Sequence, residues 1–297
     1  LFYIYTSKTL LMKKLSFILL ALVAFVACKD DAKQEDSIVI NDTVEVSEIE
    51  AETTPSYPAE LTAVIDAHGG MAAWNQMKNL CYEIDSRGGT EVHTIDLENR
   101  KSKIEHREWS IGYDGTDVWL LQNKENAYQG NARFYHNLMF YFYAMPFILS
   151  DDGIVYSEIP PTELDGKMYN GIKVGYNAGV GDSPEDEYIL YFDSETNKMT
   201  WLGYTVTYRS GEKSDDWHFI KYDKWQEVNG LLLPEKLTWY NVENGLPAGE
   251  RNDLLFDKVT VSTMKLDAAV FAKPEAAVVV PKKSPAEAMQ RKSNSRQ

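Results

Sequence analysis

The sequence has 297 residues, of which 44% are hydrophobic, and its formal net charge at pH 7 is −15. Such an acidic balance argues against a nucleic-acid partner, because neutralising phosphates requires clustered Lys and Arg. The apolar content is sufficient for a single domain to bury a core of its own. The only cysteines are Cys28 and Cys81, so the chain can form at most one internal disulfide.

Residues 12–28, MKKLSFILLALVAFVAC, have the three regions of a secretory signal. Two lysines follow Met12, an apolar run covers residues 15–26, and a small residue precedes Cys28. The apolar run is shorter than the roughly twenty residues needed to span a membrane, and charged residues follow at once. The pattern predicts an exported protein. The alternative is a signal in which the cysteine is accidental.

Residues 25–28, Phe-Val-Ala-Cys, resemble a lipobox, the site where bacterial lipoprotein signal peptidase cuts before a cysteine. This resemblance implies that residues 1–27 are removed and that acylated Cys28 anchors the protein in outer-membrane lipid. Residues 1–11 resemble translated upstream sequence and are left out of the fold prediction. Once Cys28 is acylated, Cys81 has no partner for an internal disulfide, so the fold must depend on its core.

Residues 28–57 are predicted to be a disordered acidic tether. They are rich in Asp, Glu, Thr and Ser and show little periodicity. The run Lys29-Asp30-Asp31 resembles the export signal that sends Bacteroidetes lipoproteins to the cell surface. A generic polar linker is the alternative, so the sequence leaves open whether the outer-membrane lipoprotein faces the periplasm or the cell surface.

Residues 58–70 predict a helix that opens the folded domain. Pro58 suits its first turn, apolar residues recur at i, i+3, i+4 and i+7 from Leu61 to His68, and two glycines end it. A second short helical pattern follows, with Trp74 on its apolar face.

Most of the remaining chain alternates apolar and polar residues with period two and predicts strands joined by tight turns. The predicted strands cover residues 80–84, 93–97, 101–109, 118–121, 172–176, 188–192, 202–208, 218–228, 235–242 and 253–266. Their spacing is typical of an antiparallel meander of about ten or eleven strands. Residues 275–297, rich in Pro, Lys and Ala, predict a flexible tail after a domain that covers residues 58–274.

Residues 131–150, NARFYHNLMFYFYAMPFILS, lie between the two halves of the predicted sheet and have no polar face. About eighteen residues are long enough for a helix, which Pro146 should break or kink near its end. A helix that is apolar all round is buried on more than one side.

The order of these elements resembles the LolA/LolB-like lipoprotein-localisation superfamily, and more closely a family of uncharacterised Bacteroidetes lipoproteins related to it. The matching motifs are the helix ending His68-Gly69-Gly70 with Trp74, YDG and VW at residues 113–119, YFD at 191–193 with Thr196, YDKWQEVNGLLLP at 222–234, and Leu266-Asp267 with Phe271 and Pro274. The resemblance implies an open antiparallel half-barrel, mainly β with some α, whose apolar concave face is covered by helices. In LolA and LolB this cavity holds acyl chains, whereas relatives of the same fold act as stress-sensing envelope regulators.

The aromatic middle segment contains the candidate ligand-binding residues. If it covers the mouth of a half-barrel, its apolar side chains form a lid that could close on an alkyl chain. The candidates are Phe134, Leu138, Tyr141, Phe142 and Met145. The alternative is that the same residues fill the core.

A metal site is a weaker hypothesis. If residues 99–100 form a two-residue turn, His93 lies directly opposite His106 on neighbouring strands, about 5 Å apart. The pattern predicts no third ligand.

The sequence contains no G-x-S-x-G, no H-E-x-x-H and no Gly-rich phosphate loop after a strand. We therefore predict neither an enzyme nor a cofactor.

These patterns together predict an envelope lipoprotein that binds a lipid, an acyl chain or another amphipathic molecule without covalent chemistry. The alternative is an envelope scaffold or sensor that binds a protein partner and has a filled interior. Stacking of sugars on the aromatic residues, which make up 12% of the chain, is a further possibility.

Overall fold

The computed structural model describes residues 57–86, 88–179 and 181–282. The predicted signal, Cys28 and nearly all of the acidic tether lie outside the described residues. None of the described helices is long and apolar enough to cross a membrane.

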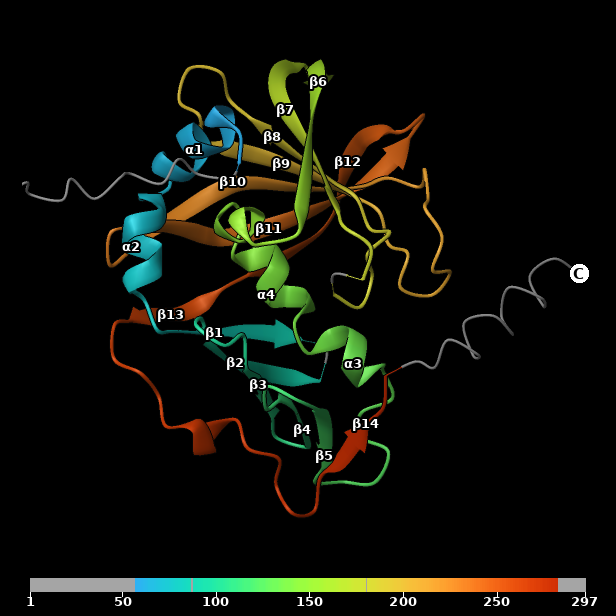
Figure 1. The fold of residues 1–297 in the computed structure, drawn as a ribbon. Coiled ribbons are helices and arrows are strands. Elements are labelled where there is room, and N and C mark those ends of the chain that lie inside the picture. The colour runs from blue at the N-terminus through green and yellow to red at the C-terminus, as the bar shows by residue number, and fades with distance from the viewer. Residues whose placement is uncertain (1–56, 87, 180, 283–297) are drawn as a thin grey trace, which may run out of the picture. The chain divides into compact units, whose positions relative to one another are not determined.

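The strands form two antiparallel sheets of seven strands each (Figure 1). The first sheet has the order β13-β1-β2-β3-β4-β5-β14 and the second has the order β12-β11-β10-β9-β8-β7-β6. The strands of the first sheet are β1 (Asn79–Ser86), β2 (Gly89–Asp96), β3 (Ser102–His106), β4 (Trp109–Tyr113), β5 (Val118–Gln122), β13 (Asp257–Ser262) and β14 (Val278–Val280). The strands of the second sheet are β6 (Ile154–Leu164), β7 (Lys167–Tyr176), β8 (Tyr188–Phe192), β9 (Met199–Tyr204), β10 (His218–Val228), β11 (Leu231–Glu243) and β12 (Leu246–Leu255).

The two sheets meet at a corner where β12 leads directly into β13. β12 ends at Leu255 and β13 begins at Asp257, so the chain passes from one sheet to the other at the buried Phe256. At the far edges, β6 and β14 each pair with one neighbour only, and the described strands do not close into a barrel. The expected fold class is confirmed: the protein is mainly β with few helices, and its antiparallel sheets form an open half-barrel that helices cover.

The described strands number fourteen, more than the ten or eleven expected from sequence. β6 carries Pro160 and Pro161, which interrupt the strand pattern in the sequence but are tolerated because β6 lies at the edge of its sheet. The expected strand 101–109 is divided by a turn into β3 and β4. The prediction of a flexible tail from residue 275 is wrong for the first residues of that tail. Residues 278–280 are β-branched valines, which favour strands, and they form β14, which pairs with β5.

Both predicted helices near the start of the domain are confirmed as α1 (Ala59–Asp66) and α2 (Gly70–Gln76). α1 buries Leu61, Val64 and Ile65 on one face, as the spacing predicts. The backbone between the helices packs on the turn between β10 and β11, where the amide of Leu232 donates to the His68 carbonyl oxygen at 2.9 Å. The two helices therefore cover one end of the second sheet (Figure 1).

His68 is fully buried at the end of α1, with its ring 4.5 Å from that of Trp225. Because a carbonyl oxygen only accepts, Nδ1 must carry the proton that it donates to Val64 O at 2.7 Å. Nε2 is buried without a hydrogen-bond partner. Burial lowers the pKa of His68 to about 4, although the bond to Val64 opposes the shift.

We expect His68 to make folding stability depend on pH. The unfolded chain binds a proton on this residue below about pH 6.5 and the folded chain does not until about pH 4, so stability falls with pH in this window. The free energy of unfolding should drop by about 2 kcal/mol between pH 7 and pH 5 through this group alone. His68→Gln should remove this share of the pH dependence, measured by urea unfolding at both pH values.

Burial also lowers the pKa of His93 and His136, so the variant should keep a smaller pH dependence in the same direction. An unchanged difference between pH 7 and pH 5 in His68→Gln would contradict the assignment. The comparison holds even if the substitution lowers stability at pH 7, because the slope with pH is what is measured.

The middle segment does not form the single helix of about eighteen residues that the sequence predicts. It is divided into α3 (Ala132–Tyr135), α4 (Leu138–Tyr143) and a short 3₁₀ helix, η1 (Phe147–Ser150). Asn137, with φ of −128°, interrupts the helix after α3, and Pro146 precedes η1. We call residues 131–150 the lid segment.

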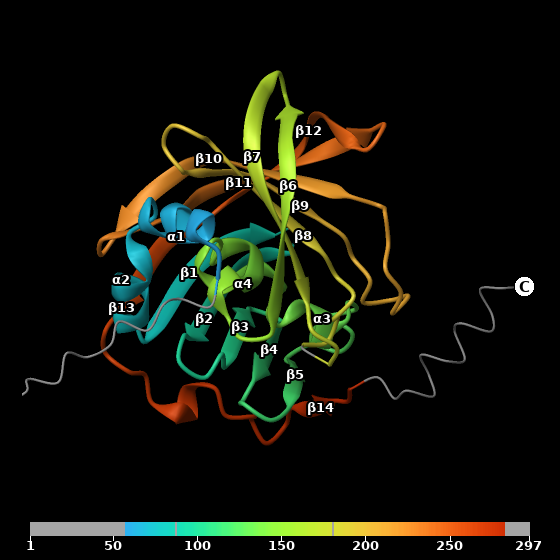
Figure 2. The same ribbon diagram turned by 45° about the horizontal axis from the view of Figure 1, so that its top comes forward.

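The lid segment lies between the two sheets and fills much of the space that they enclose (Figure 2). Tyr143, Met145, Phe147 and Leu149 have no exposed surface and belong to the same hydrophobic core as the inner faces of both sheets. The ring of Phe147 stacks on Trp74 of α2 at 4.6 Å between centroids. The interior of the half-barrel is therefore packed with side chains from the lid segment.

Candidate ligand-binding pocket

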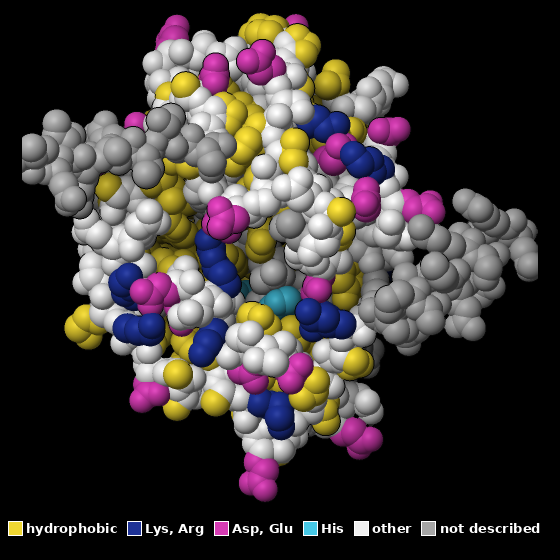
Figure 3. All heavy atoms as spheres, in the orientation of Figure 1, with side chains coloured by type: hydrophobic (Ala, Val, Ile, Leu, Met, Phe, Trp, Pro, Cys, Tyr) yellow, Lys and Arg dark blue, Asp and Glu magenta, His cyan; other side chains and the backbone are white. Residues whose placement is uncertain are grey.

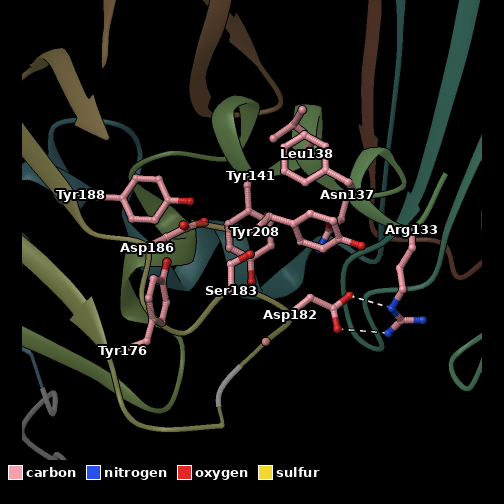
Figure 4. Close-up of a pocket in the computed structure, with 12 residues that line it drawn as sticks. Arg133, Asn137, Leu138, Tyr141, Tyr176, Asp182, Ser183, Asp186, Tyr188 and Tyr208 are labelled. Carbon is pink, nitrogen blue, oxygen red and sulfur yellow. Dashed lines mark hydrogen bonds and ion pairs between the residues drawn. The ribbon is translucent and has the colours of Figure 1, made fainter. Parts of the chain in front are cut away.

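A pocket of about 110 Å³ opens where α3 and α4 face the strands β7 and β8 and the connection between them (Figure 4). From the lid segment it is lined by Phe134, Leu138 and Tyr141, which are all half-buried. From the second sheet it is lined by Tyr176 at the end of β7 and Tyr188 at the start of β8. The walls are thus mainly aromatic and apolar, with phenol hydroxyl groups at several points.

One side of the pocket carries a paired charge. The guanidinium group of Arg133 contacts both carboxylate oxygens of Asp182, with Nη2 3.1 Å from Oδ1 and Nε 3.0 Å from Oδ2. Figure 4 shows the two parallel contacts. Arg133 is buried, 7% exposed, whereas the side chain of Asp182 is 35% exposed, so the pair lies at the rim of the pocket. The two contacts fix the position of Asp182 and of the loop to which it belongs.

The other charge in the pocket is the carboxylate of Asp186. Its Oδ1 accepts two hydrogen bonds from Thr207, from the amide at 2.5 Å and from the hydroxyl at 2.6 Å. Among the described residues, no Lys, Arg or His forms an ion pair with Asp186. Burial raises the pKa of Asp186, while the bonds from Thr207 oppose this shift.

Tyr176 and Tyr188 stay protonated at neutral pH. Burial raises the pKa of Tyr188, and the nearby carboxylate of Asp186 raises it further. Burial also raises the pKa of Tyr176, with smaller contributions from Tyr188, Tyr141 and Asp186. The pocket therefore presents neutral hydroxyl groups and one carboxylate whose charge no described cation balances.

The structure divides the five lid residues that the sequence singled out. Phe134, Leu138 and Tyr141 line the pocket, whereas Phe142 and Met145 lie in the core, 5% and 0% exposed. The ring of Phe142 packs against Tyr204, with 5.0 Å between centroids. Within α4, Leu138 and Tyr141 lie on the face toward the pocket, and Phe142 lies on the face toward the core.

The sequence reasoning did not select the pocket residues of the second sheet. Tyr176 and Tyr188 could have been found, because period-two alternation puts them on the same strand faces as Val174 and Leu190, which pack in the core. Asp186 carries no such signal. It lies in a loop, and only the fold brings it opposite the lid segment.

The hypothesis of a His93 and His106 pair is wrong in its register. β2 ends at Asp96 and β3 begins at Ser102, so His93 pairs with Ile104 rather than with His106. The cause is Asp96, whose Oδ1 accepts from the amides of Glu98 and Asn99 and so widens the turn. Within the described parts of the chain, no group of three or more His, Cys, Asp or Glu could hold a metal ion.

His93 belongs instead to a buried polar cluster beneath α3. Its Nε2 lies 3.4 Å from Oε2 of Glu91, and the same oxygen accepts a 2.7 Å hydrogen bond from the Tyr135 hydroxyl. Burial would raise the pKa of Glu91, but His93 and Tyr135 outweigh this and lower it. The Tyr135 bond connects the lid segment to the first sheet.

A second pocket, of about 380 Å³, lies between the start of α1 and the strands β6 and β7. Its charged residues, Glu60 and Glu158, are exposed, and none of the lid residues contributes to it. The smaller pocket is the better candidate site, because half-buried aromatic and acidic side chains from distant parts of the chain converge there.

Comparison with known proteins gives a family match and several structural matches. A family of unknown function, DUF6503, matches residues 99–246. A comparison of the sequence with curated proteins finds no match.

Three solved structures illustrate the structural similarity. A LolA superfamily protein from Nitrosomonas europaea is 10% identical, with a TM-score of 0.41, covering 66% of this chain and 88% of its own. A DUF1329 family protein from Desulfovibrio piger is 10% identical, with a TM-score of 0.43, covering 72% and 96%. An outer membrane lipoprotein-sorting protein domain from Vibrio parahaemolyticus is 10% identical, with a TM-score of 0.35, covering 66% and 88%. These matches include LolA superfamily and lipoprotein-sorting proteins, the resemblance that the sequence suggested, and at 10% identity they concern the fold alone.

Proposed function

We propose that this protein binds one end of an amphipathic small molecule non-covalently, in the pocket between the lid segment and strands β7 and β8. The observation that carries the proposal is the convergence of half-buried Phe134, Leu138 and Tyr141 with the tyrosines of the second sheet. Each buried methylene of a ligand would contribute about 0.8 kcal/mol to binding. The proposed role involves no chemical step.

The size of the pocket limits how much of a ligand it takes. Its volume of about 110 Å³ is below the roughly 300–1,000 Å³ of pockets that enclose a whole drug-sized molecule. Next to it, in the interior of the half-barrel, Tyr143 and Met145 are completely buried in the hydrophobic core. We therefore infer that the pocket holds a head group or a short segment, while the rest of the ligand lies outside.

We also propose that Cys28 is acylated and anchors the protein in the outer membrane, facing either the periplasm or the cell surface. The support is the sequence of residues 12–28, with its charged, apolar and small-residue regions followed by cysteine. An anchored domain would meet amphipathic molecules at the membrane surface, where they are concentrated.

The filled interior favours a second candidate function, an envelope scaffold or sensor that binds a protein partner. The large apolar side chains of Val242, Leu246 and Leu255 are exposed on β11 and β12 and could contribute to such a contact. In this case the pocket would bind no amphipathic molecule.

Binding of the neutral dye N-phenyl-1-naphthylamine tests the proposed function. We expect the full-length protein to bind the dye and enhance its fluorescence. Leu138→Asp should weaken binding by about tenfold or more, because it places a charge against the alkyl-binding wall. Met168→Asp is the matched control: it makes the same kind of change at a side chain that is 51% exposed on β7 and does not line the pocket.

The outcomes separate the two candidate functions. Equal loss of binding in both variants would show that the dye binds outside the pocket. A folded wild-type protein that binds no dye would overturn the proposed function and favour the scaffold or sensor. Circular dichroism of each variant establishes that it is folded.

A further inference from the structure

The charges of the pocket indicate which kind of head group it selects. Arg133 and Asp182 neutralise each other through two contacts, so the guanidinium is already occupied. Asp186 remains as a second carboxylate, and among the described residues it has no cationic partner. A half-buried site with one unbalanced negative charge favours a cation and disfavours an anion.

The hydrogen-bonding groups around Asp186 narrow the choice of cation. Thr207 occupies Oδ1 with two hydrogen bonds, and among the described residues no hydrogen bond reaches Oδ2. The hydroxyl ends of Tyr176 and Tyr188 are directed toward this carboxylate (Figure 4). One carboxylate oxygen and two phenol oxygens thus gather at one place. A primary ammonium group has three N–H donors to offer to such a set.

The aromatic walls suit the same ligand. The rings of Tyr176 and Tyr188 lie edge to face with 6.0 Å between centroids. Aromatic rings attract cations through their negative faces, most strongly where water is excluded. The apolar side chain of Leu138 lies on the lid side of the same pocket and suits an alkyl chain attached to the cation.

We propose that the pocket recognises a primary ammonium group carried on an apolar chain, with Asp186 as its counter-charge and the hydroxyls of Tyr176 and Tyr188 as hydrogen-bond partners. This inference rests on the proposed function and specifies the chemical class of its ligand. The ammonium could come from a lipid head group of the ethanolamine type or from a free alkylamine, and the chemistry of recognition is the same.

The chain as a whole is acidic, but no patch of acidic side chains explains such a preference on the face drawn in Figure 3. On the face drawn in Figure 3, basic and acidic side chains are interspersed rather than gathered into a patch of one sign. The selection should therefore depend on Asp186 itself. Removing another acidic charge close by should have little effect.

Displacement of N-phenyl-1-naphthylamine from the full-length protein by a series of octyl compounds tests the proposal. Octylamine, protonated at pH 7, should displace the dye at a concentration about tenfold lower than neutral octyl glucoside or anionic octyl sulfate. Octyltrimethylammonium, which has the charge without N–H donors, should fall between octylamine and octyl glucoside.

Asp186→Asn should reduce the advantage of octylamine over octyl glucoside to less than about threefold. The asparagine oxygen can still accept from Thr207, so the loop should keep its conformation. Glu185→Gln is the matched control, because it removes the same charge from the adjacent residue, which does not line the pocket. Tyr188→Phe should lower the affinity for octylamine and leave that for octyl glucoside unchanged.

Equal displacement by all four head groups would overturn the inference and leave the proposed function intact. An equal loss of the octylamine advantage in Asp186→Asn and Glu185→Gln would also overturn it, because the preference would then come from general charge. Failure of the wild-type protein to bind the dye would overturn the proposed function and the inference together.

A last comparison identifies the source of the ammonium. Lysophosphatidylethanolamine carries the group next to a phosphate, and octylamine carries it alone. The compound that displaces the dye at the lower concentration indicates whether the site is built for a lipid head group or for a free amine. If neither exceeds octyl glucoside, the inference is wrong.

Discussion

Replacing Gly69 with alanine should destabilise the domain by roughly 3–5 kcal/mol or more, enough to prevent folding of a protein of ordinary stability. Gly69 has φ of +112°, a conformation that L-residues with a side chain rarely adopt. A Cβ at this position would overlap the carbonyl oxygen of Gly230 and lie 3.1 Å from Cα of Leu231. Both neighbours are backbone atoms of the turn between β10 and β11, which cannot move aside without breaking the turn.

Gly70→Ala is the matched control for this prediction. Gly70 also has positive φ, +82°, but its added Cβ would have only Asp66 Oδ1 nearby, at 3.4 Å. We expect a loss of about 1–2 kcal/mol, the cost of the left-handed backbone alone. Urea unfolding of both variants measures the difference. Equal losses would mean that the contact between the helices and the turn contributes little to the fold.

Phe142→Asp should abolish the folded state at neutral pH. Removing a buried Phe side chain costs about 3–5 kcal/mol, and burying an unpaired carboxylate costs several more. Phe142 is 5% exposed, and its ring packs against Tyr204 and Trp239 with centroids 5.0 and 6.1 Å away. The sum is comparable with the whole stability of a typical domain.

Leu138→Asp, on the same short helix, is expected to keep the fold because Leu138 is only half-buried and faces the pocket. Near-ultraviolet circular dichroism and a cooperative thermal transition distinguish the two variants. A Phe142→Asp protein that stays folded but no longer binds N-phenyl-1-naphthylamine would show that Phe142 is a ligand-binding residue. The pair therefore tests which face of α4 meets the ligand.

Much of the architecture could be predicted from local patterns. The spacing of Leu61, Val64 and Ile65 predicted the buried face of α1, and the two glycines after His68 predicted its end. Alternation predicted the faces of most strands correctly, including the one that carries Tyr188. These features depend on neighbours within a few residues, so the sequence contains them directly.

The features that the sequence reasoning missed depend on details of turns and edges. The observed register of β2 against β3 differs from the expected register by two residues, because Asp96 stabilises a longer turn than the two-residue turn that was assumed. β6 was missed because its prolines are acceptable only at an edge, which is known only once the sheet is assembled. β14 was missed because three valines form a strand only where an edge such as β5 is available.

By itself, the sequence determined that the domain is built from antiparallel strands and few helices, and that residues 131–150 are buried on more than one side. Only the tertiary structure decided that Phe142 belongs to the core and Leu138 to a pocket, and that Asp186 lies opposite the lid segment. The physical reason is that hydrophobic periodicity reports which side chains avoid water. Whether a buried side chain packs in the core or lines a pocket depends on contacts between segments far apart in the chain.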